Sequence, residues 1–459
     1  MPSDDVDVVV IGMGPGGEAV ATRLAGAGVR VAGVEGRLVG GECPYYACVP
    51  TKMMVRGADA LAEARRVPRL AGTAEAHPDW TRIADRIRDE ATTDWDDRDA
   101  VRRFEDSGGH FVRGIGRITG PGEVTVATPP GVDDRVLWAR RGIVLNPGTE
   151  PAIPPIDGLE GTPFWTNRDA VRTRAVPHSL IVLGGGPVGL ELSQVFARFG
   201  ADTALVEAGP RLLRHGEPAA SERITAVFEN EGISVHTGTS ARRVRYLDGQ
   251  FSVELSSGTT LSAECLLVAT GRRSDLATLG VGAVGLDESA RTVEVDGRMR
   301  AADGVWAVGD VTGRGAFTHT SVYQAAIAAA DILGEGGDPA DYRAEPAVTF
   351  TDPEIAEVGL TEARARERGL AVRTGRAEIP ATARGWIHKA GNDGVITLVA
   401  DAERGVLVGA TVVAPSGGEV LGALAVAVHA EVPVARLRGM ILAYPTFHRG
   451  IEDALADLS

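Results

Sequence analysis

Cysteine is scarce in this chain, long apolar runs are missing, and basic residues are outnumbered. Three cysteines in 459 residues exclude a secreted scaffold held together by disulfides. Without a run of about 18 apolar residues, a membrane span is not expected. Without a basic and apolar leader at the N-terminus, the cytoplasm is the expected compartment. A formal net charge of -15 makes nucleic acid and anionic membranes unfavourable partners.

Glycine, by contrast, is abundant, and much of it falls into a pattern that occurs twice. An apolar strand leads into a glycine-rich turn, a helical stretch follows, and a second strand ends in a glutamate. The glycines and the acid are Gly12, Gly14, Gly17 and Glu35 in the first copy, and Gly184, Gly186, Gly189 and Glu207 in the second. The first glycine precedes the acid by 23 positions in both copies.

This pattern is typical of a dinucleotide-binding βαβ unit. The first glycine permits a tight turn, the second lets the backbone approach a pyrophosphate, and the third lets the helix pack closely on the sheet. The helix N-terminus attracts the phosphates, and the acid can accept hydrogen bonds from a ribose diol. Two copies predict two dinucleotide sites, one for a tightly held cofactor and one for an exchanging cofactor.

Two cysteines lie five positions apart, just after the first βαβ unit. In the segment 40–52, GGECPYYACVPTK, Pro44 suits the first turn of a helix, so one helix is expected to carry Cys43 at its start and Cys48 little more than a turn later. A helix N-terminus favours the reactive thiolate. The spacing exceeds that of a zinc site and no second Cys or His cluster completes one, so no metal is expected. Cys265 falls in an apolar strand and is assigned to core packing.

The pattern of apolar and polar residues changes along the rest of the chain. A helical stretch is expected over roughly 52–103, a β-meander before residue 150, and a linker over 147–155. A buried strand ends in Gly309 and Asp310. Beyond about residue 345, alternating stretches at 395–399 and 405–410 mix with helices, which indicates an α+β domain.

Together these segments resemble the flavoprotein pyridine nucleotide–disulfide oxidoreductases, the family of dihydrolipoamide dehydrogenase, glutathione reductase and mercuric reductase. The resemblance covers nearly the whole chain. It rests on both glycine motifs, the Gly-Gly-x-Cys-x4-Cys-x-Pro-Thr-Lys box, the segment 269–272 with Gly271, the Gly309-Asp310 pair and the segment 350–362.

The resemblance implies an α/β fold with two Rossmann-like dinucleotide-binding domains and a C-terminal α+β dimerisation domain. Residues 1–150 and 271–343 would bind FAD, residues 151–270 would bind NAD(P), and residues 344–459 would form the interface of a homodimer. Glu35 would bind the adenosine ribose of FAD, and Asp310 would lie on its flavin side. Lys52 would sit near the flavin ring, paired with Glu191.

The resemblance further implies that Cys43 and Cys48 form a redox-active disulfide, which a reduced nicotinamide reduces through the flavin. Cys48 would lie nearer the flavin, and Cys43 would attack the acceptor. Glu207 would repel a 2′-phosphate, so NADH is favoured over NADPH. Arg211 and Arg214 follow closely and are interpreted as surface charges, with contact to a 2′-phosphate as the alternative.

The C-terminal box departs from the family pattern. Thiol-producing members carry His-Pro-Thr-x-x-Glu, contributed from the partner subunit, whereas this chain has Tyr444 and Arg449 at the first and last positions. A phenol with a pKa of about 10 is a poor base at neutral pH, so ordinary disulfide reduction is expected to be slow unless another group substitutes. His448 with Glu452 is a candidate, and a solvated i,i+4 contact is its alternative. Two other departures are Tyr45-Tyr46 and the segment 146–149.

Three functions are compatible with these residues. The leading one is an FAD- and NAD(P)H-dependent enzyme that passes electrons through Cys43 and Cys48 to a small disulfide or another thiol-reactive acceptor. The second is a quinone or metal-ion reductase of the mercuric type. Mercuric reductases also carry a tyrosine at the position of Tyr444, although their C-terminal cysteine pair is missing here. The third is a non-catalytic, FAD-binding redox-sensing subunit, kept open by the lost His and Glu.

Overall fold

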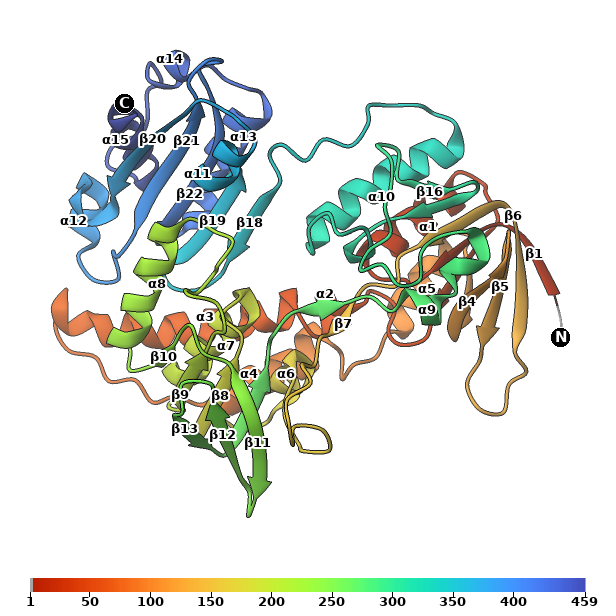
Figure 1. Ribbon diagram of the computed structural model, residues 1–459, viewed down its shortest axis with the longest axis horizontal. Coiled ribbons are helices and arrows are strands. Elements are labelled where there is room, and N and C mark those ends of the chain that lie inside the picture. The colour runs from red at the N-terminus through yellow and green to blue at the C-terminus, as the bar shows by residue number, and fades with distance from the viewer. Residues whose placement is uncertain (1–2, 459) are drawn as a thin grey trace. The chain divides into compact units, whose positions relative to one another are not determined.

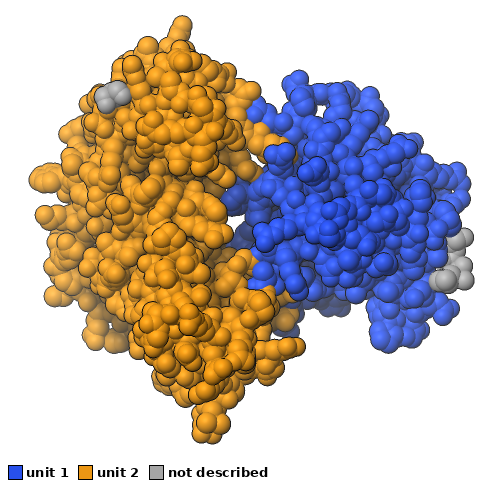
Figure 2. Space-filling view, viewed as in Figure 1, with its two compact units in different colours: residues 1–50, 85–152, 272–341 blue, residues 51–84, 153–271, 342–459 orange. Residues whose placement is uncertain are grey.

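The computed structural model describes residues 3–458, which fall into two compact units (Figure 2). Unit 1 comprises Met1–Pro50, Asp85–Ala152 and Arg272–Asp341. Unit 2 comprises Thr51–Ala84, Ile153–Gly271 and Tyr342–Ser459. Each unit is therefore assembled from segments that lie far apart in the sequence.

A largely parallel sheet forms the centre of unit 1, in the strand order β16-β17-β6-β1-β2-β3. β1 (Ser3–Ile11) pairs in parallel with β2 (Val31–Glu35) and with β6 (Arg135–Leu145). α1 (Pro15–Gly26) connects β1 to β2, as the glycine pattern predicts. The other strands are β3 (His110–Arg113), β4 (Ile115–Gly120), β5 (Glu123–Ala127), β16 (Arg300–Ala302) and β17 (Val305–Ala307).

Alternate side chains of β1 enter two different cores. Val8 and Val10 pack with side chains of α1 and α10 (Thr318–Leu333), which run beside each other in Figure 1. Val9 and Ile11 pack with side chains of β4 and β5 in a second cluster. Because successive side chains of a strand point to opposite faces, burial of both faces requires the unbroken apolar run seen in the sequence.

The prediction of a continuous helical stretch over 52–103 is wrong, because the structure has several shorter helices there. α3 (Cys48–Arg66) is followed by a 3-10 turn, Val67–Arg69, and then by a loop. Pro68 lacks the N–H that an α-helix needs, and Gly72 and Pro78 lie in the loop, so the helix cannot continue. The later helical segments are α4 (Trp80–Arg86), the π-helical turn Ile87–Ala91 and α5 (Arg98–Asp106).

Unit 2 contains the second glycine motif in a parallel sheet of order β10-β9-β8-β14. β8 (Ser179–Leu183), α7 (Pro187–Arg198) and β9 (Asp202–Val206) form the predicted βαβ unit. β10 (Ser234–His236) and β14 (Cys265–Val268) flank it. An antiparallel sheet packs into the same core, and it consists of β11 (Ala241–Leu247), β12 (Gln250–Leu255) and β13 (Thr260–Ala263). Two helices complete this part, α6 (Asn167–Arg172) and α8 (Pro218–Asn230).

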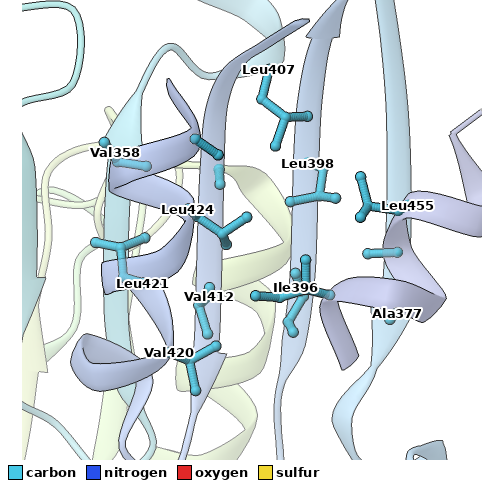
Figure 3. Close-up of a cluster of buried hydrophobic side chains, with 14 of the residues drawn as sticks. Val358, Ala377, Ile396, Leu398, Leu407, Val412, Val420, Leu421, Leu424 and Leu455 are labelled. Carbon is cyan, nitrogen blue, oxygen red and sulfur yellow. The ribbon is translucent and has the colours of Figure 1, made fainter. Parts of the chain in front are cut away.

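The C-terminal part of unit 2 is an antiparallel sheet covered by helices. Its order is β18-β19-β22-β21-β20, and the expected stretches at 395–399 and 405–410 belong to β21 and β22. Leu424 of α13 and Leu455 of α15 point toward Val412 and Leu398 of the sheet (Figure 3). The strands are β18 (Pro346–Thr349), β19 (Glu354–Gly359), β20 (Val372–Glu378), β21 (Val395–Asp401) and β22 (Val406–Ala414). The helices are α11 (Glu362–Glu367), α12 (Ala383–His388), α13 (Gly417–His429), α14 (Val434–Leu437) and α15 (Gly450–Asp457).

The expected linker over 147–155 contains a short strand. β7 (Glu150–Pro151) pairs with β15 (Arg272–Arg273), and α9 (Leu276–Leu279) follows β15. Two parallel βαβ sheets and an α+β C-terminal part confirm the predicted fold class. The domain boundaries given above stay a prediction. Within residues 3–458, no helix is long and apolar enough to cross a membrane.

Candidate active site

The two glycine loops are built alike at their first and third glycines. Gly12 has a φ of 92° and Gly184 a φ of 112°, left-handed values that favour glycine. A Cβ on Gly17 would overlap the carbonyl oxygen of Gly12, and a Cβ on Gly189 would overlap that of Gly184. These glycines are therefore required by the close packing of each helix on its turn.

The middle glycines, Gly14 and Gly186, have ordinary backbone angles, with φ of -70° and -87°. In the described chain, a Cβ on Gly186 would meet no atom within 4 Å, and one on Gly14 would meet only the amide of Asn146 at 3.3 Å. Both glycines precede helices whose N-termini receive no side-chain cap from residues 3–458. Open space beside uncapped N–H groups fits a pyrophosphate approaching the backbone.

The two glutamates that end β2 and β9 are held in the same way. Glu35 accepts hydrogen bonds from the backbone N–H of Met13 at 2.9 Å and of Arg37 at 2.8 Å. Glu207 accepts from Gly185 at 2.7 Å and from Gly209 at 2.6 Å. Burial raises the pKa of Glu35, and its two backbone hydrogen bonds oppose that rise. Each carboxylate is thus fixed beside its glycine loop with further acceptor capacity for a ribose diol.

Asp310 begins a 3-10 turn, Asp310–Thr312, next to Gly309, whose φ is 80°. The hydroxyl of Thr149 donates to the Asp310 carboxylate at 2.6 Å, and Nε of Arg272 donates to that hydroxyl at 2.7 Å. Arg272 also lies 3.6 Å from the carboxylate of Glu42, the neighbour of Cys43. Gly271, with a φ of 119°, precedes Arg272 at the turn into β15. A polar chain therefore links Asp310 to the segment that carries the cysteines.

Asn146, which departs from the family pattern, belongs to the first glycine loop. Its side-chain amide donates to the carbonyl of Gly12 at 3.2 Å, and its backbone N–H donates to Ile11 at 2.8 Å. The side chain is buried. The substitution therefore adds a contact that ties β6 to the loop.

The two cysteines do not share one helix, which corrects the expectation from the sequence. Cys43 lies in the short helix α2 (Glu42–Tyr45), which ends at Tyr46, where ψ is -5° and φ is -139°. Cys48 is the first residue of α3. Both side chains are half-buried. A turn separates α2 from α3, in place of the single helix expected from Pro44.

The sulfur of Cys48 lies at the start of a second helix as well. Its Sγ is 3.5 Å from the hydroxyl oxygen of Thr318, the first residue of α10. The N-terminus of a helix carries partial positive charge. Two helices that begin at one sulfur favour its thiolate form. Thr318 was not predicted from the sequence.

The bulky residues between the cysteines behave differently from each other. Tyr45 is buried, and its carbonyl accepts a hydrogen bond from the indole of Trp95 at 3.2 Å. Burial raises the pKa of Tyr45, and the charge of Asp97 adds to the rise. Tyr45 is therefore packed in the interior of unit 1. Tyr46 is half-buried.

Lys52 lies one turn after Cys48 on α3 and is engaged on two sides. Its ammonium donates to Oε2 of the buried Glu191 at 2.7 Å. The same ammonium lies 4.7 Å from the centre of the Phe350 ring. The backbone N–H of Phe350 donates to the other oxygen of Glu191 at 2.9 Å. The structure thus brings together the two residues that the resemblance paired.

The contact between α3 and α7 repeats one heptad further along both helices. Asp59 binds Arg198 at 2.7 Å, and the side chain of Arg198 is 4% exposed. Arg198 also binds Glu231 at 2.6 Å and Asp352 at 2.8 Å, and Arg66 reaches Asp352 at 2.6 Å. Burial raises the pKa of Asp59 to about 6, against the opposing charge of Arg198. We call the pairs of α3 with α7 and Asp352 the charge ladder.

The C-terminal box presents Tyr444 to solvent, with 69% of its surface exposed. The guanidinium of Arg449 lies 5.4 Å from the centre of its ring. Arg449 also binds Glu452 at 2.9 Å, so the carboxylate considered for His448 is engaged by Arg449. His448 is half-buried in the 3-10 turn Phe447–Arg449.

The third cysteine, Cys265, lies in surroundings that make its thiol unreactive. Cys265 is buried in β14, and burial raises the pKa of its thiol to about 12. Across residues 3–458, no group of three or more His, Cys, Asp or Glu side chains is arranged to hold a metal ion.

Comparison with known proteins agrees with this geometry. Residues 6–328 match the family described as pyridine nucleotide-disulphide oxidoreductase, and residues 345–455 match its dimerisation domain. A mercuric reductase of Acidithiobacillus ferrooxidans is 33% identical over 452 residues, which cover 98% of this chain and 82% of that protein. A dihydrolipoyl dehydrogenase of Chlorobaculum tepidum is 32% identical over 461 residues, which cover 98% of this chain and 96% of that protein.

Two solved structures match over the whole length. The Cu(II) complex of the HOCl-induced flavoprotein disulfide reductase RclA from Escherichia coli has a TM-score of 0.86 at 26% identity and covers 99% of both chains. LpdA from Mycobacterium tuberculosis has a TM-score of 0.86 at 25% identity and covers 99% of this chain and 100% of that one.

The chain belongs to the pyridine nucleotide-disulphide oxidoreductase family. It is a flavoprotein disulfide reductase, an enzyme that uses FAD and a pyridine nucleotide, which confirms the family, fold and enzyme class predicted from the sequence. The non-catalytic alternative is set aside accordingly. The dimerisation domain indicates a homodimer.

The open space at Gly186 gives a prediction. Gly186→Ala should fold normally, because the added methyl meets no described atom, but should raise the nucleotide concentration for half-maximal flavin reduction at least about tenfold. Anaerobic stopped-flow absorbance measures this concentration without any acceptor. Gly26→Ala, an exposed helical glycine with open space around it, is the matched control and should change nothing. An unchanged concentration in Gly186→Ala would show that no phosphate approaches this loop.

Proposed function

We propose that this chain is an NADH-dependent reductase in which electrons reach a Cys43–Cys48 disulfide and pass to a small disulfide or another thiol-reactive acceptor. The observation that carries the proposal is the place of the Cys48 sulfur, at the start of two helices and beside a hydroxyl. The proposal includes the division into residues 1–150 with 271–343 for FAD, 151–270 for NAD(P) and 344–459 for the interface.

The residues present fit both cofactors. The first glycine loop and Glu35 would hold the pyrophosphate and adenosine ribose of FAD, with Asp310 on the flavin side. The second loop and Glu207 would hold the nucleotide. Bound together, the two cofactors supply a pair of electrons to the disulfide. Lys52, oriented by Glu191, would place a positive charge near the flavin.

The two cysteines have different roles. Two electrons and a proton open the disulfide to a Cys43 thiol and a Cys48 thiolate. After losing its proton, Cys43 attacks a sulfur of the acceptor disulfide, so that a mixed disulfide forms and one acceptor thiolate leaves. Cys48 then attacks the sulfur of Cys43, the mixed disulfide breaks, and the second acceptor thiolate leaves. The two acceptor thiolates take up the proton that Cys43 lost and one proton from water, so the acceptor gains two electrons and two protons, and the Cys43–Cys48 bond is restored.

Cys48→Ser should abolish the long-wavelength absorbance of the two-electron-reduced enzyme, because that band requires a thiolate beside the flavin. Cys43→Ser is the matched control: it leaves Cys48 without a disulfide partner, so the band should already be present before reduction and should disappear when dithionite reduces the flavin. Anaerobic titration with dithionite, followed by absorbance, measures both. Persistence of the band in Cys48→Ser would overturn the assignment.

The preference for NADH is supported by how the residues after β9 are engaged. The guanidinium of Arg211 donates to three carbonyls of its own loop, those of Leu213 at 3.2 Å, Arg214 at 2.9 Å and Gly216 at 2.8 Å. Glu207 stands at the ribose position and would repel a phosphate. Arg211 is therefore a structural residue of the loop in this proposal.

For the nucleotide, we expect kcat/KM to be at least about tenfold higher with NADH than with NADPH. Glu207→Gln keeps the shape of the side chain but removes its charge, so the ratio should narrow. Arg214→Gln, a change at an exposed position in the same loop, should leave the ratio unchanged. Steady-state rates with each nucleotide test this, and a preference for NADPH in the unmodified enzyme would refute it.

A metal-ion or quinone acceptor is a second candidate because of the C-terminal box. Reduction of a metal ion returns no proton to the acceptor, and a quinone can take its two protons from water, so proton delivery by a histidine matters less. The box offers Tyr444 beside Arg449. Relatives of this chain are named mercuric reductase as well as dihydrolipoyl dehydrogenase, and RclA was solved as a Cu(II) complex.

Acceptor choice is tested by a panel of lipoamide, a quinone and Hg(II) with four forms of the enzyme. Tyr444→His alone should not raise lipoamide reduction, because Arg449 would disfavour the imidazolium. Tyr444→His with Arg449→Glu should raise it at least about tenfold, since a positioned general base contributes about 10²–10⁴ in rate. Arg449→Glu alone is the control. A gain from the Tyr444 change by itself would contradict this account of the pair.

A further inference from the structure

The contact between Cys48 and Thr318 joins two residues that each begin a long helix. α3 has 19 residues and α10 has 16. Thr318 Oγ1 lies 3.5 Å from Cys48 Sγ, within hydrogen-bonding distance for sulfur. The N-cap residue of α10 is Phe317, whose side chain provides no capping hydrogen bond.

We infer that Thr318 is a catalytic residue that stabilises the Cys48 thiolate by donating a hydrogen bond from its hydroxyl. The inference deepens the proposed function and rests on it, because it requires Cys48 to be the sulfur that carries negative charge between reduction and release of the acceptor.

The direction of the hydrogen bond follows from the protonation of the sulfur. When Cys48 is a thiol, either the S–H or the O–H can donate. A thiolate has no proton, so only the hydroxyl can donate, and the bond becomes charge-assisted. A hydrogen bond that strengthens on ionisation favours the ionised form. Thr318 therefore acts on the charged sulfur and much less on the neutral one.

Other titratable groups occur on the elements around this sulfur. Lys52 lies on the same helix, but its charge is compensated by Glu191 at 2.7 Å. The ring of His319 stacks on Phe317 at 5.1 Å. The remaining groups are Glu42, Cys43 and Tyr45 on α2, and Tyr46 directly after it, with Glu42 3.6 Å from Arg272. The hydroxyl of Thr318 is an uncharged donor within hydrogen-bonding distance of the sulfur.

The experiment uses the full-length FAD-loaded enzyme with Cys43→Ser, which leaves Cys48 as the reactive thiol. Into it are introduced Thr318→Val, which removes the hydroxyl at constant shape, and Thr318→Ser, which keeps the hydroxyl. The first readout is the rate of Cys48 alkylation by iodoacetamide against pH, which needs no turnover. The second is the long-wavelength absorbance against pH. Flavin content and circular dichroism confirm folding, and Thr318→Ala replaces the Val variant if that variant does not fold.

Thr318→Val should raise the pH midpoint of both curves by about one unit, so that well below the midpoint the thiolate is about tenfold rarer. Thr318→Ser should follow the parent. Coincident curves for Val and Ser would overturn the inference while leaving the proposed function intact. A parent without the band, in which Cys48 titrates like an ordinary thiol near pH 8.5, would instead refute the proposed function.

Discussion

A lysine that follows the redox sulfur by one turn is held in place by a buried carboxylate on another helix. Glu191 binds Lys52 with one oxygen and the backbone N–H of Phe350 with the other. A buried charge must be paired, so removal of Lys52 would leave the buried carboxylate of Glu191 uncompensated and destabilise the fold. The charge ladder repeats this constraint at Arg198. Ion pairs at two-turn intervals therefore fix the position of α3. They also fix Cys48, the first residue of this helix.

Sequence patterns within single βαβ units were sufficient to predict much of the fold and the two glycine loops of the site. The turn at Gly184 and the close packing at Gly189 follow from the sequence around them, because each depends on atoms of one strand, one turn and one helix. The strand ending in Glu207 and the buried strand of Cys265 follow in the same way from apolar runs.

Apart from the Lys52–Glu191 pair, which the family resemblance implied, contacts between distant segments were not predicted from the sequence. Thr318 lies 270 positions from Cys48, and nothing in its local sequence says that its hydroxyl meets a sulfur. The break between α2 and α3 was missed for a different reason: Pro44 correctly marks a helix start, but it does not tell how soon the helix ends. The ladder was missed because Asp59 and Arg66 look like ordinary surface charges in the sequence, and their partners, Arg198 and Asp352, lie 139 and 286 positions away.

Because Cys265 is buried, the number of thiols that react in the folded protein can be compared with the number that react after unfolding. A thiol whose pKa is raised to about 12 in a closed strand does not react with aqueous reagents while the protein is folded. Every thiol that reacts in the folded protein is then Cys43 or Cys48. Unfolding exposes one further thiol, that of Cys265, which serves as an internal standard. The oxidation level of the pair can be read as a stoichiometry, without any assay of turnover.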